Sequence, residues 1–309
     1  ICSSDAIAKI SSGTFISNED AAVISCIQGV GSIINQGNVW TDEEGNVLEG
    51  AASKKNIIPS KAGKAIKVSE HKEHSYENHY CRDCLVMEKE SANVSVQIGE
   101  TENCFETLLQ AIEYANGKDA YITLLKDYED INEDNLGKIF SIDKGNITID
   151  LGNYNYTLNY VIKINGGNVQ FKGEKGSLRC NEWCPTIWVN GGAGVSFEGG
   201  NYYGKYTPLL VQNTGNVSCE IKLKNAVFEG KIMATYFTFD SLSDSEKIYI
   251  DGCKMVSDNC ALQAIKANVT IRDVEISSST IGAYFFDSTV KVYSGTFEAE
   301  EKALYLQNT

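Results

Sequence analysis

The C-terminal part of the chain repeats one pattern of apolar positions every 21 residues. The aligned sets are Ile248, Val269 and Val290; Ile250, Ile271 and Val292; Met255, Ile276 and Phe297; Leu262, Ala283 and Leu304; and Ala264, Phe285 and Leu306. Apolar and polar residues alternate within each short run, which is the pattern of a strand with one buried face. A fixed period of this size is typical of a solenoid, in which each repeat buries its inner face by stacking on its neighbours.

The same signature continues upstream as apolar pairs separated by one residue. The pairs are Ile221 and Leu223, Val195 and Phe197, Val169 and Phe171, Ile147 and Ile149, and Ile122 and Leu124. Three short strands with polar turns fill a coil of this length, and turn insertions account for the uneven spacing. Because crossovers between parallel strands are almost always right-handed, we predict an all-β, right-handed parallel β-helix with coils about 4.8 Å apart. A leucine-rich or helical solenoid is the rival, but the coils lack its pattern.

The pattern also divides the chain. The early segment SSGTFISNEDAAVIS matches YSGTFEAEEKALYLQ near the end, so residues 1–52 are predicted to be terminal coils of a preceding β-helix. The coil pattern fades over residues 53–92, which we interpret as a linker or inserted module. Residues 93–309 are predicted to form one β-helix. Because the coil pattern runs to both termini without a capping element, we expect the natural protein to be longer at both ends.

A helix is predicted at the start of the long solenoid, over residues 104–116 in ENCFETLLQAIEYANGK. Its apolar face comprises Phe105, Leu108, Leu109 and Ile112. Asn103 is the expected N-cap and Gly117 the expected stop. An amphipathic helix in this place is expected to cover the open end of the solenoid core.

The charge of the chain limits its partners. The 309 residues are 42% hydrophobic and carry a formal net charge of −14, with a pI near 4.7. This charge opposes the positive field that phosphate backbones require, so nucleic acid is not an expected partner. No apolar run reaches the roughly 18 residues of a membrane span, and we expect no membrane insertion.

Four segments in succession resemble a known family. They are VSVQIGETENCFETLLQAIEYANGKDAYITLLKDYED, GNITIDLGNYNYTLN, INGGNVQFKG and SGTF. They resemble the pectate-lyase-like β-helix repeats of large secreted or surface proteins of anaerobic Gram-positive bacteria, over most of residues 66–309 and weakly over the first 50. In that family a strand, a TLxxAI helix and a TLLKD strand open each solenoid, often after a small His-rich insert with a CxxC motif. The resemblance implies a fold and a surface location rather than a reaction.

The linker holds all three histidines of the chain, His71, His74 and His79, together with Cys81 and Cys84. Two imidazoles and two thiolates are donors that suit tetrahedral Zn²⁺. The predicted ligands are His71, His74, Cys81 and Cys84, with His79 in place of His71 as an alternative. Four protein ligands would make the zinc structural, because no position stays open for catalysis. The competing interpretation is a polar linker with a redox-inactive CxxC or a local disulfide.

Tyrosine-rich segments such as GNYNY and GGNYYGKY suggest contacts with sugar rings. Tyr154 and Tyr202 align with the column that holds Phe228, so they are predicted to be core residues. Tyr203 and Tyr206 are left as the predicted exposed ligand contacts. The cysteines of the apolar runs, namely Cys26, Cys219, Cys253 and Cys260, are expected to be buried free thiols.

Charged residues of adjacent coils are expected to pair across the ladder, Asp251 with Arg272 and Lys254 with Glu275. A pectate-type lyase needs an Arg or Lys base and Ca²⁺ on clustered acids, and this chain has only three arginines. The glycoside hydrolases of this fold carry a Gly-His-Gly motif, whereas these coils contain no histidine. We therefore assign no catalytic residue.

Calcium is a further candidate ligand, and we assign no site to it. The acidic groups considered are Asp127, Glu129 and Asp130, and Asp240, Asp244 and Glu246. Such acids can bind Ca²⁺, but in turns they are ordinarily solvated.

These features favour a noncatalytic bacterial β-helix, secreted or displayed at the cell surface, that acts as a stalk or adhesin-like module. Its expected partners are host or microbial glycans or surface proteins. The alternative is a polysaccharide lyase or glycoside hydrolase with a groove along one β-sheet, because carboxylate spacing across coils is invisible in the sequence.

Overall fold

The computed structural model describes residues 7–9, 12–16, 21–25, 32–34, 38–48, 57–60, 64–70, 75–81, 87–213, 219–242 and 246–309. The chain divides into two compact units, one of Ile1–Ala92 with Thr101–Glu106 and one of Asn93–Glu100 with Thr107–Thr309. Strands make up 64% of the structure and there is a single short α-helix among the described residues, which confirms the all-β prediction.

The first unit contains short strands in several small sheets. They are β1 (Ile7–Lys9), β2 (Gly13–Ile16), β3 (Ala21–Ser25), β4 (Ser32–Ile34), β5 (Asn38–Thr41), β6 (Ile57–Ser60), β7 (Ala65–Glu70), β8 (Tyr76–Glu77), β9 (Tyr80–Cys81) and β11 (Thr101–Phe105). Strand β7 pairs antiparallel with both β2 and β5, and β3 pairs antiparallel with β6, whereas β1 and β4 are parallel. Trp40, Ile66 and Val68 form a small core beside Phe15 and Leu48.

This pairing bears on the predicted domain boundary at residue 52. Strand β7 lies in the range interpreted as a linker, yet its hydrogen bonds join it to strands of residues 1–52. The antiparallel pairing also differs from the parallel stacking expected of coils. The interpretation of residues 1–52 as the end of another β-helix stays a prediction.

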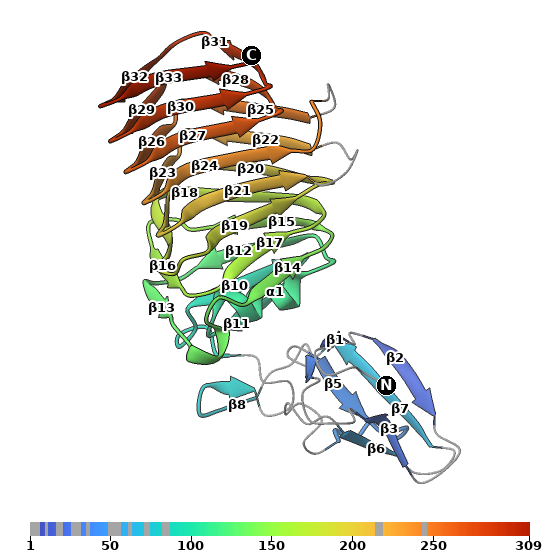
Figure 1. The fold of residues 1–309 in the computed structure, drawn as a ribbon. Helices are drawn as coiled ribbons and strands as arrows, with labels where there is room; N and C mark the ends of the chain where they lie inside the picture. Colours follow the sequence, from blue (N-terminus) through green and yellow to red (C-terminus); the bar gives the residue numbers. More distant parts are fainter. Residues whose placement is uncertain are drawn as a thin grey trace. The chain divides into compact units, whose positions relative to one another are not determined.

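The second unit is a parallel β-solenoid of about seven turns (Figure 1). Each complete turn supplies one rung to each of three ladders. The first ladder comprises β12 (Ala120–Leu124), β15 (Asn146–Asp150), β18 (Gly167–Cys180), β20 (Ala193–Gly204), β22 (Cys219–Lys224), β25 (Glu246–Asp251), β28 (Asn268–Arg272) and β31 (Thr289–Val292). The second comprises β13 (Tyr128–Asp130), β16 (Asn155–Leu158), the C-terminal halves of β18 and β20, β23 (Val227–Gly230), β26 (Lys254–Ser257), β29 (Val274–Ser278) and β32 (Gly295–Ala299). The third comprises β14 (Ile139–Ile142), β17 (Val161–Ile164), β19 (Pro185–Asn190), β21 (Thr207–Asn213), β24 (Met233–Phe239), β27 (Cys260–Ile265), β30 (Ile281–Phe286) and β33 (Lys302–Gln307).

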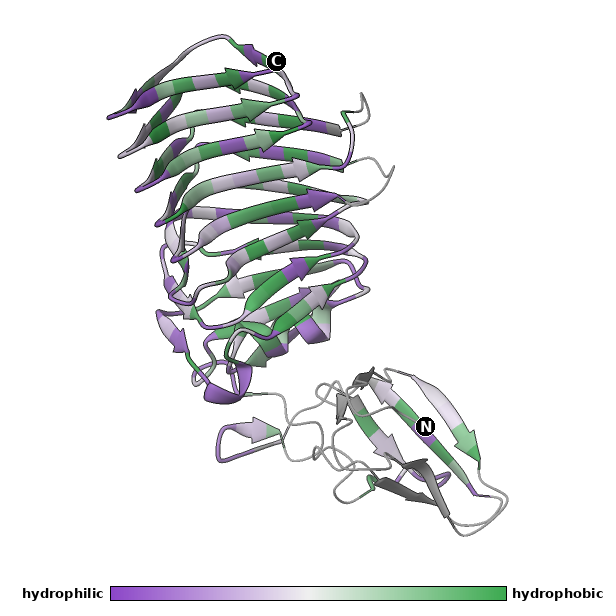
Figure 2. Ribbon diagram, in the orientation of Figure 1, coloured by the Kyte–Doolittle hydropathy of each residue, from purple (hydrophilic) through white to green (hydrophobic). Residues whose placement is uncertain are grey.

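The apolar columns read from the sequence are the register of these ladders. Ile248 pairs with Val269, and Val269 with Val290. The other four predicted columns are likewise confirmed. Figure 2 shows the hydropathy alternating along the strands. Buried side chains therefore fill the interior while every second residue faces outward.

At the first coil, the observed register differs by two residues from the register predicted from the sequence. Ile122 pairs with Ile149, so the members of the columns are Ala120 and Ile122 rather than the predicted Ile122 and Leu124. All three side chains are buried. Because the side-chain period of a strand is two, a shift of two residues keeps the same face inward, and the pattern alone does not distinguish the two registers.

Aromatic rings fill the corner between the first and second ladders. Phe197 stacks on Phe171 with ring centroids 4.9 Å apart, and Tyr202 meets Phe197 edge-on, also at 4.9 Å. Tyr202 is fully buried, as predicted. Tyr154 is 39% exposed, and the prediction that it lies in the core is wrong, because Tyr156 pairs in register with the inward column instead.

The only α-helix in the described residues, α1 (Leu108–Ala115), packs against β10 (Val94–Ile98), β12 and β14 at the N-terminal end of the solenoid (Figure 1). Leu108, Leu109, Ala111, Ile112, Tyr114 and Ala115 are buried, so the helix covers the core as predicted. It is shorter than predicted at its N-terminus. Phe105 belongs to strand β11, and the N-cap is Thr107, which forms a capping box with Gln110. Gly117 follows the C-cap with φ +85°, a conformation that favours glycine and stops the helix.

A buried polar network holds the N-terminus of α1 in place. The Tyr156 hydroxyl accepts a hydrogen bond from the Leu108 N–H at 2.6 Å and donates one to Asp130 Oδ2 at 3.0 Å. The Tyr160 hydroxyl donates to the same oxygen at 2.9 Å. Burial is the main cause that raises the pKa of Tyr156 and Tyr160 well above the usual value. Both phenols therefore stay neutral donors beneath the helix.

The predicted charge pairs lie in register. Lys254 faces Glu275, with Nζ 3.7 Å from Oε2, and Asp251 is the register partner of Arg272. The Arg272 guanidinium lies over the Tyr293 ring at 4.5 Å. These are exposed contacts of modest worth.

Candidate functional site

Two outward columns of the third ladder, from β19 to β33, contain no charged residue. We call them the uncharged face. The first column is Trp188, Leu210, Tyr236, Gln263, Tyr284 and Tyr305, and the second is Asn190, Gln212, Thr238, Ile265, Phe286 and Gln307. On β19 to β30 the side chains alternate with buried core residues, whereas the inward Leu304 and Leu306 of β33 are exposed. All the members of the two columns but the exposed Gln307 are half-buried. The face is therefore a continuous strip of rings, aliphatic groups and amides along the solenoid axis.

The rings of this strip are held in defined positions. Tyr284 and Tyr305 stack with centroids 5.1 Å apart, and the Tyr284 hydroxyl donates to Gln307 Oε1 at 3.1 Å. Burial, together with the neighbouring Tyr305, raises the pKa of Tyr284. Fixed rings and amides bind a ligand without a large loss of side-chain entropy.

Lysines lie at both ends of the strip. Lys163, the β17 residue in register with Trp188, has its Nζ 4.1 Å from the centre of that indole. Lys302 has its Nζ 4.0 Å from the centre of the Tyr305 ring. The lysines thus mark the limits of the strip, and the rings between them face solvent without a cation over them in the contacts of the described residues.

Three of the four rings of the first column recur at a regular interval. Trp188 and Tyr236 are two rungs apart, as are Tyr236 and Tyr284. With rungs about 4.8 Å apart, this places a ring about every 9.6 Å. The sequence contains a signal for this arrangement, because each of these rings is the residue between the two inward positions of its third-ladder strand. The tyrosine-rich segments GNYNY and GGNYYGKY lie outside this strip.

The predicted ligand contacts Tyr203 and Tyr206 lie in adjacent elements, and both side chains are half-buried. Tyr203 faces outward on the second ladder, where the Arg179 guanidinium lies 4.2 Å from its ring centre. Tyr206 lies in the turn between β20 and β21. Burial is the main cause that raises the pKa of Tyr206, and its neighbour Tyr236 adds to the effect. Of the two, Tyr203 has a charged residue, Arg179, packed on its ring.

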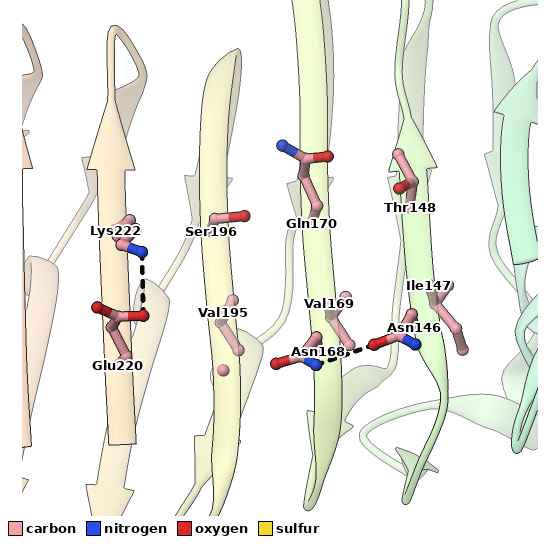
Figure 3. Close-up of a pocket in the computed structure, with 11 residues that line it drawn as sticks. Asn146, Ile147, Thr148, Asn168, Val169, Gln170, Val195, Ser196, Glu220 and Lys222 are labelled. Atoms are coloured by element: carbon pink, nitrogen blue, oxygen red, sulfur yellow. Dashed lines mark hydrogen bonds and ion pairs between the residues drawn. The ribbon is translucent and has the colours of Figure 1, made fainter. Parts of the chain in front are cut away.

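A shallow polar depression of about 350 Å³ lies on the outside of the first ladder (Figure 3). Its floor consists of residues from β15, β18, β20 and β22. Asn168 donates to Asn146 Oδ1 at 2.9 Å, and Lys222 donates to Glu220 Oε2 at 3.0 Å. Gly194 lies between these two pairs, and a Cβ there would meet Asn168 Oδ1 at 2.6 Å, so the depression depends on this glycine.

The chemistry of the depression is limited. Glu220 is the one carboxylate among the described residues that line it, and it is already paired with Lys222. Glycoside hydrolysis ordinarily uses two carboxyl groups about 5–10 Å apart. The lining therefore provides polar contacts rather than the acid pair of a hydrolase.

Most of the predicted zinc ligands lie outside the described residues, namely His71, His74 and Cys84. Cys81 is buried in β9. The alternative ligand His79 is exposed, and its Nδ1 lies 2.8 Å from Ser91 Oγ. The zinc site stays a prediction, which metal analysis of protein purified without chelator would test.

Two of the six acidic residues considered for calcium have carboxylates that accept hydrogen bonds from other groups. Asp127 Oδ1 accepts the Asn155 N–H at 2.7 Å, and Asp130 accepts the two buried phenols. Asp244 lies outside the described residues. In the described part of the chain, no three His, Cys, Asp or Glu side chains gather in a group that could hold a metal ion.

The cysteines of the coils match their expected role in part. Cys253 and Cys260 are buried free thiols, and burial raises the pKa of each to about 11. Cys219 is buried as well, whereas Cys26 lies outside the described residues.

Comparisons with protein-family models, with curated proteins and with solved structures give no match. Among the described residues no helix has the length and hydropathy to cross a membrane.

Proposed function

We propose that the solenoid is a noncatalytic glycan-binding module of a secreted or surface-displayed bacterial protein, of the pectate-lyase-like β-helix type. The observation that supports this proposal is the uncharged face. On a chain with a net charge of −14, two columns over six strands contain no charge and are rich in rings and amides.

The composition of the face fits an extended neutral polysaccharide. Aromatic rings pack against the C–H faces of pyranose rings, and amides such as Gln212 and Gln263 supply both donors and acceptors for hydroxyl groups. A ring about every 9.6 Å along the axis corresponds to alternate sugars of an extended chain. A stalk or adhesin would present such a surface repeatedly along its length.

Binding measurements with paired tyrosine variants test the proposal. Affinity electrophoresis against neutral and uronate-containing polysaccharides is expected to show binding to a neutral chain. The double variant Tyr236→Ala/Tyr284→Ala is expected to lose affinity at least tenfold, about 1.4 kcal/mol. The matched control is Tyr249→Ala, which removes an outward tyrosine from the first ladder and should leave affinity unchanged.

Three results would count against the proposal. Absence of binding to every polysaccharide would reject glycan binding. An equal loss in Tyr249→Ala would place the ligand elsewhere. Release of shortened or unsaturated sugars during incubation would favour the alternative, a polysaccharide lyase or glycoside hydrolase.

A further inference from the structure

Two cysteines lie together at the turn between the second and third ladders. Cys180 is the last residue of β18, and Cys184 directly precedes β19. Their Sγ atoms are 3.7 Å apart, and both are free thiols. Cys180 is buried and Cys184 is half-buried. The two residues span a tight turn, so their proximity is a local property of this coil.

We propose that Cys180 and Cys184 form a disulfide across this turn when the protein meets a small-molecule disulfide such as oxidised glutathione. The Cys184 thiolate attacks one sulfur of the oxidant, forms a mixed disulfide and releases one thiolate. The Cys180 thiolate then attacks the Cys184 sulfur and releases the second. The two cysteines are oxidised by two electrons, the oxidant is reduced to two thiols, and the two cysteine protons end on those thiols.

The surroundings favour Cys184 as the attacking group. The hydrogen bond with Cys180 lowers the pKa of Cys184, whereas the same contact, together with burial, raises the pKa of Cys180. Cys184 is also the more exposed of the two thiols. Lower pKa and access are the two properties that select an attacking thiol.

Formation of the disulfide requires a small movement of one of the two cysteines. A disulfide needs the sulfurs about 2.05 Å apart, closer than the present 3.7 Å. The Cys180 carbonyl accepts the Lys205 N–H at 3.1 Å, which anchors the end of β18 in the ladder. The adjustment therefore falls on Cys184 and the turn.

A disulfide between Cys180 and Cys184 would restrain Trp183, which lies in the turn between them. Trp183 is 58% exposed, and the Nζ atoms of Lys205 and Lys231 lie 4.9 and 5.9 Å from its ring centre. Oxidation is therefore expected to fix an aromatic and cationic surface element that is freer in the dithiol form.

Thiol mapping of the full chain tests the proposal. The protein is incubated with oxidised glutathione, unfolded, alkylated and digested with trypsin. Cleavage after Arg179 and Lys205 leaves both cysteines in one peptide. That peptide is expected to lack two hydrogen atoms and to resist alkylation, while the internal controls Cys253 and Cys260 are alkylated. Full alkylation of Cys180 and Cys184 after oxidation would overturn the proposal.

Single substitutions test the order of attack. In Cys180→Ser, Cys184 is expected to accumulate as a mixed disulfide with glutathione, because the resolving thiol is absent. In Cys184→Ser, Cys180 is expected to stay a thiol. The reverse pattern in two variants with unchanged circular dichroism would overturn the assigned roles.

Discussion

The outer surfaces of the first and third ladders differ sharply although both cover the same core. The outward positions of the first ladder include Asp150, Lys172, Glu198, Glu220, Lys222, Lys224, Lys247, Asp251, Arg272 and Lys291. The uncharged face of the third ladder has none over six strands. Since inward residues are similar on both sides, core packing does not explain the difference.

The comparison separates what the fold requires from what it leaves free. An inward side chain in a close-packed interior contributes several kcal/mol, whereas an outward cross-strand pair contributes about 0.2–1 kcal/mol. Folding therefore places little constraint on outward residues. The long outward strip without charge is therefore not a requirement of the fold, and it is the observation on which the proposed function rests.

Truncation of the shared core is expected to have the largest effect on both surfaces. Phe197 touches Phe171, Tyr202 and Phe228. Phe197→Ala should lower the free energy of unfolding by about 3–5 kcal/mol, measured by urea denaturation. Ser196→Ala, on the outer side of the same strand, should change it by less than about 0.5 kcal/mol. Equal effects would contradict the division into inner and outer columns.

A carboxylate placed on the uncharged face is expected to weaken polysaccharide binding, whereas one placed on the first ladder is not. Tyr236→Asp is expected to weaken polysaccharide binding at least tenfold, about 1.4 kcal/mol, because the ligand must then desolvate a carboxylate. Ser196→Asp on the first ladder is the control and should leave affinity unchanged. Thermal unfolding of both variants verifies that they are folded. Retained binding in folded Tyr236→Asp would remove the face from consideration.

The first ladder should show a distinctive tyrosine titration. The hydrogen bond from Tyr121 to Asp150, aided by burial, raises the pKa of Tyr121 to about 12. Since the folded value exceeds the unfolded value of about 10, the stabilisation is complete below about pH 10 and is lost as pH rises toward about 12. The difference in tyrosinate absorbance between the wild type and Tyr121→Phe should be centred near pH 12. A centre near pH 10 would show that the contact is absent in solution.

Exposed ion pairs should contribute least. A double-mutant cycle on Lys254→Ala and Glu275→Ala is expected to give a coupling of about 0–1 kcal/mol that falls as salt is added. Both side chains are more than half exposed, so water screens the pair. A large coupling that persists in high salt would show that charge on the outer surfaces matters more to folding than we infer.

The apolar pattern of the chain was sufficient to predict the solenoid and most of its register. Columns such as Ile248, Val269 and Val290 were readable because consecutive coils bury equivalent positions, and the capping helix was readable from its apolar face. The predicted register of the first coil and the predicted first residue of the helix were wrong. A shift of two residues leaves the same strand face inward, and Phe105 is apolar in a strand as well as in a helix.

Which outward residues form a common surface could not be predicted without the folded chain. Trp188, Tyr236 and Tyr284 are each unremarkable in their own strands, and the ladder alone aligns them. The structure likewise brought the sulfurs of Cys180 and Cys184 within 3.7 Å of each other. The physical reason is that burial repeats along the chain and leaves a pattern there, whereas outward neighbours are set by stacking and carry no periodic signal of their own.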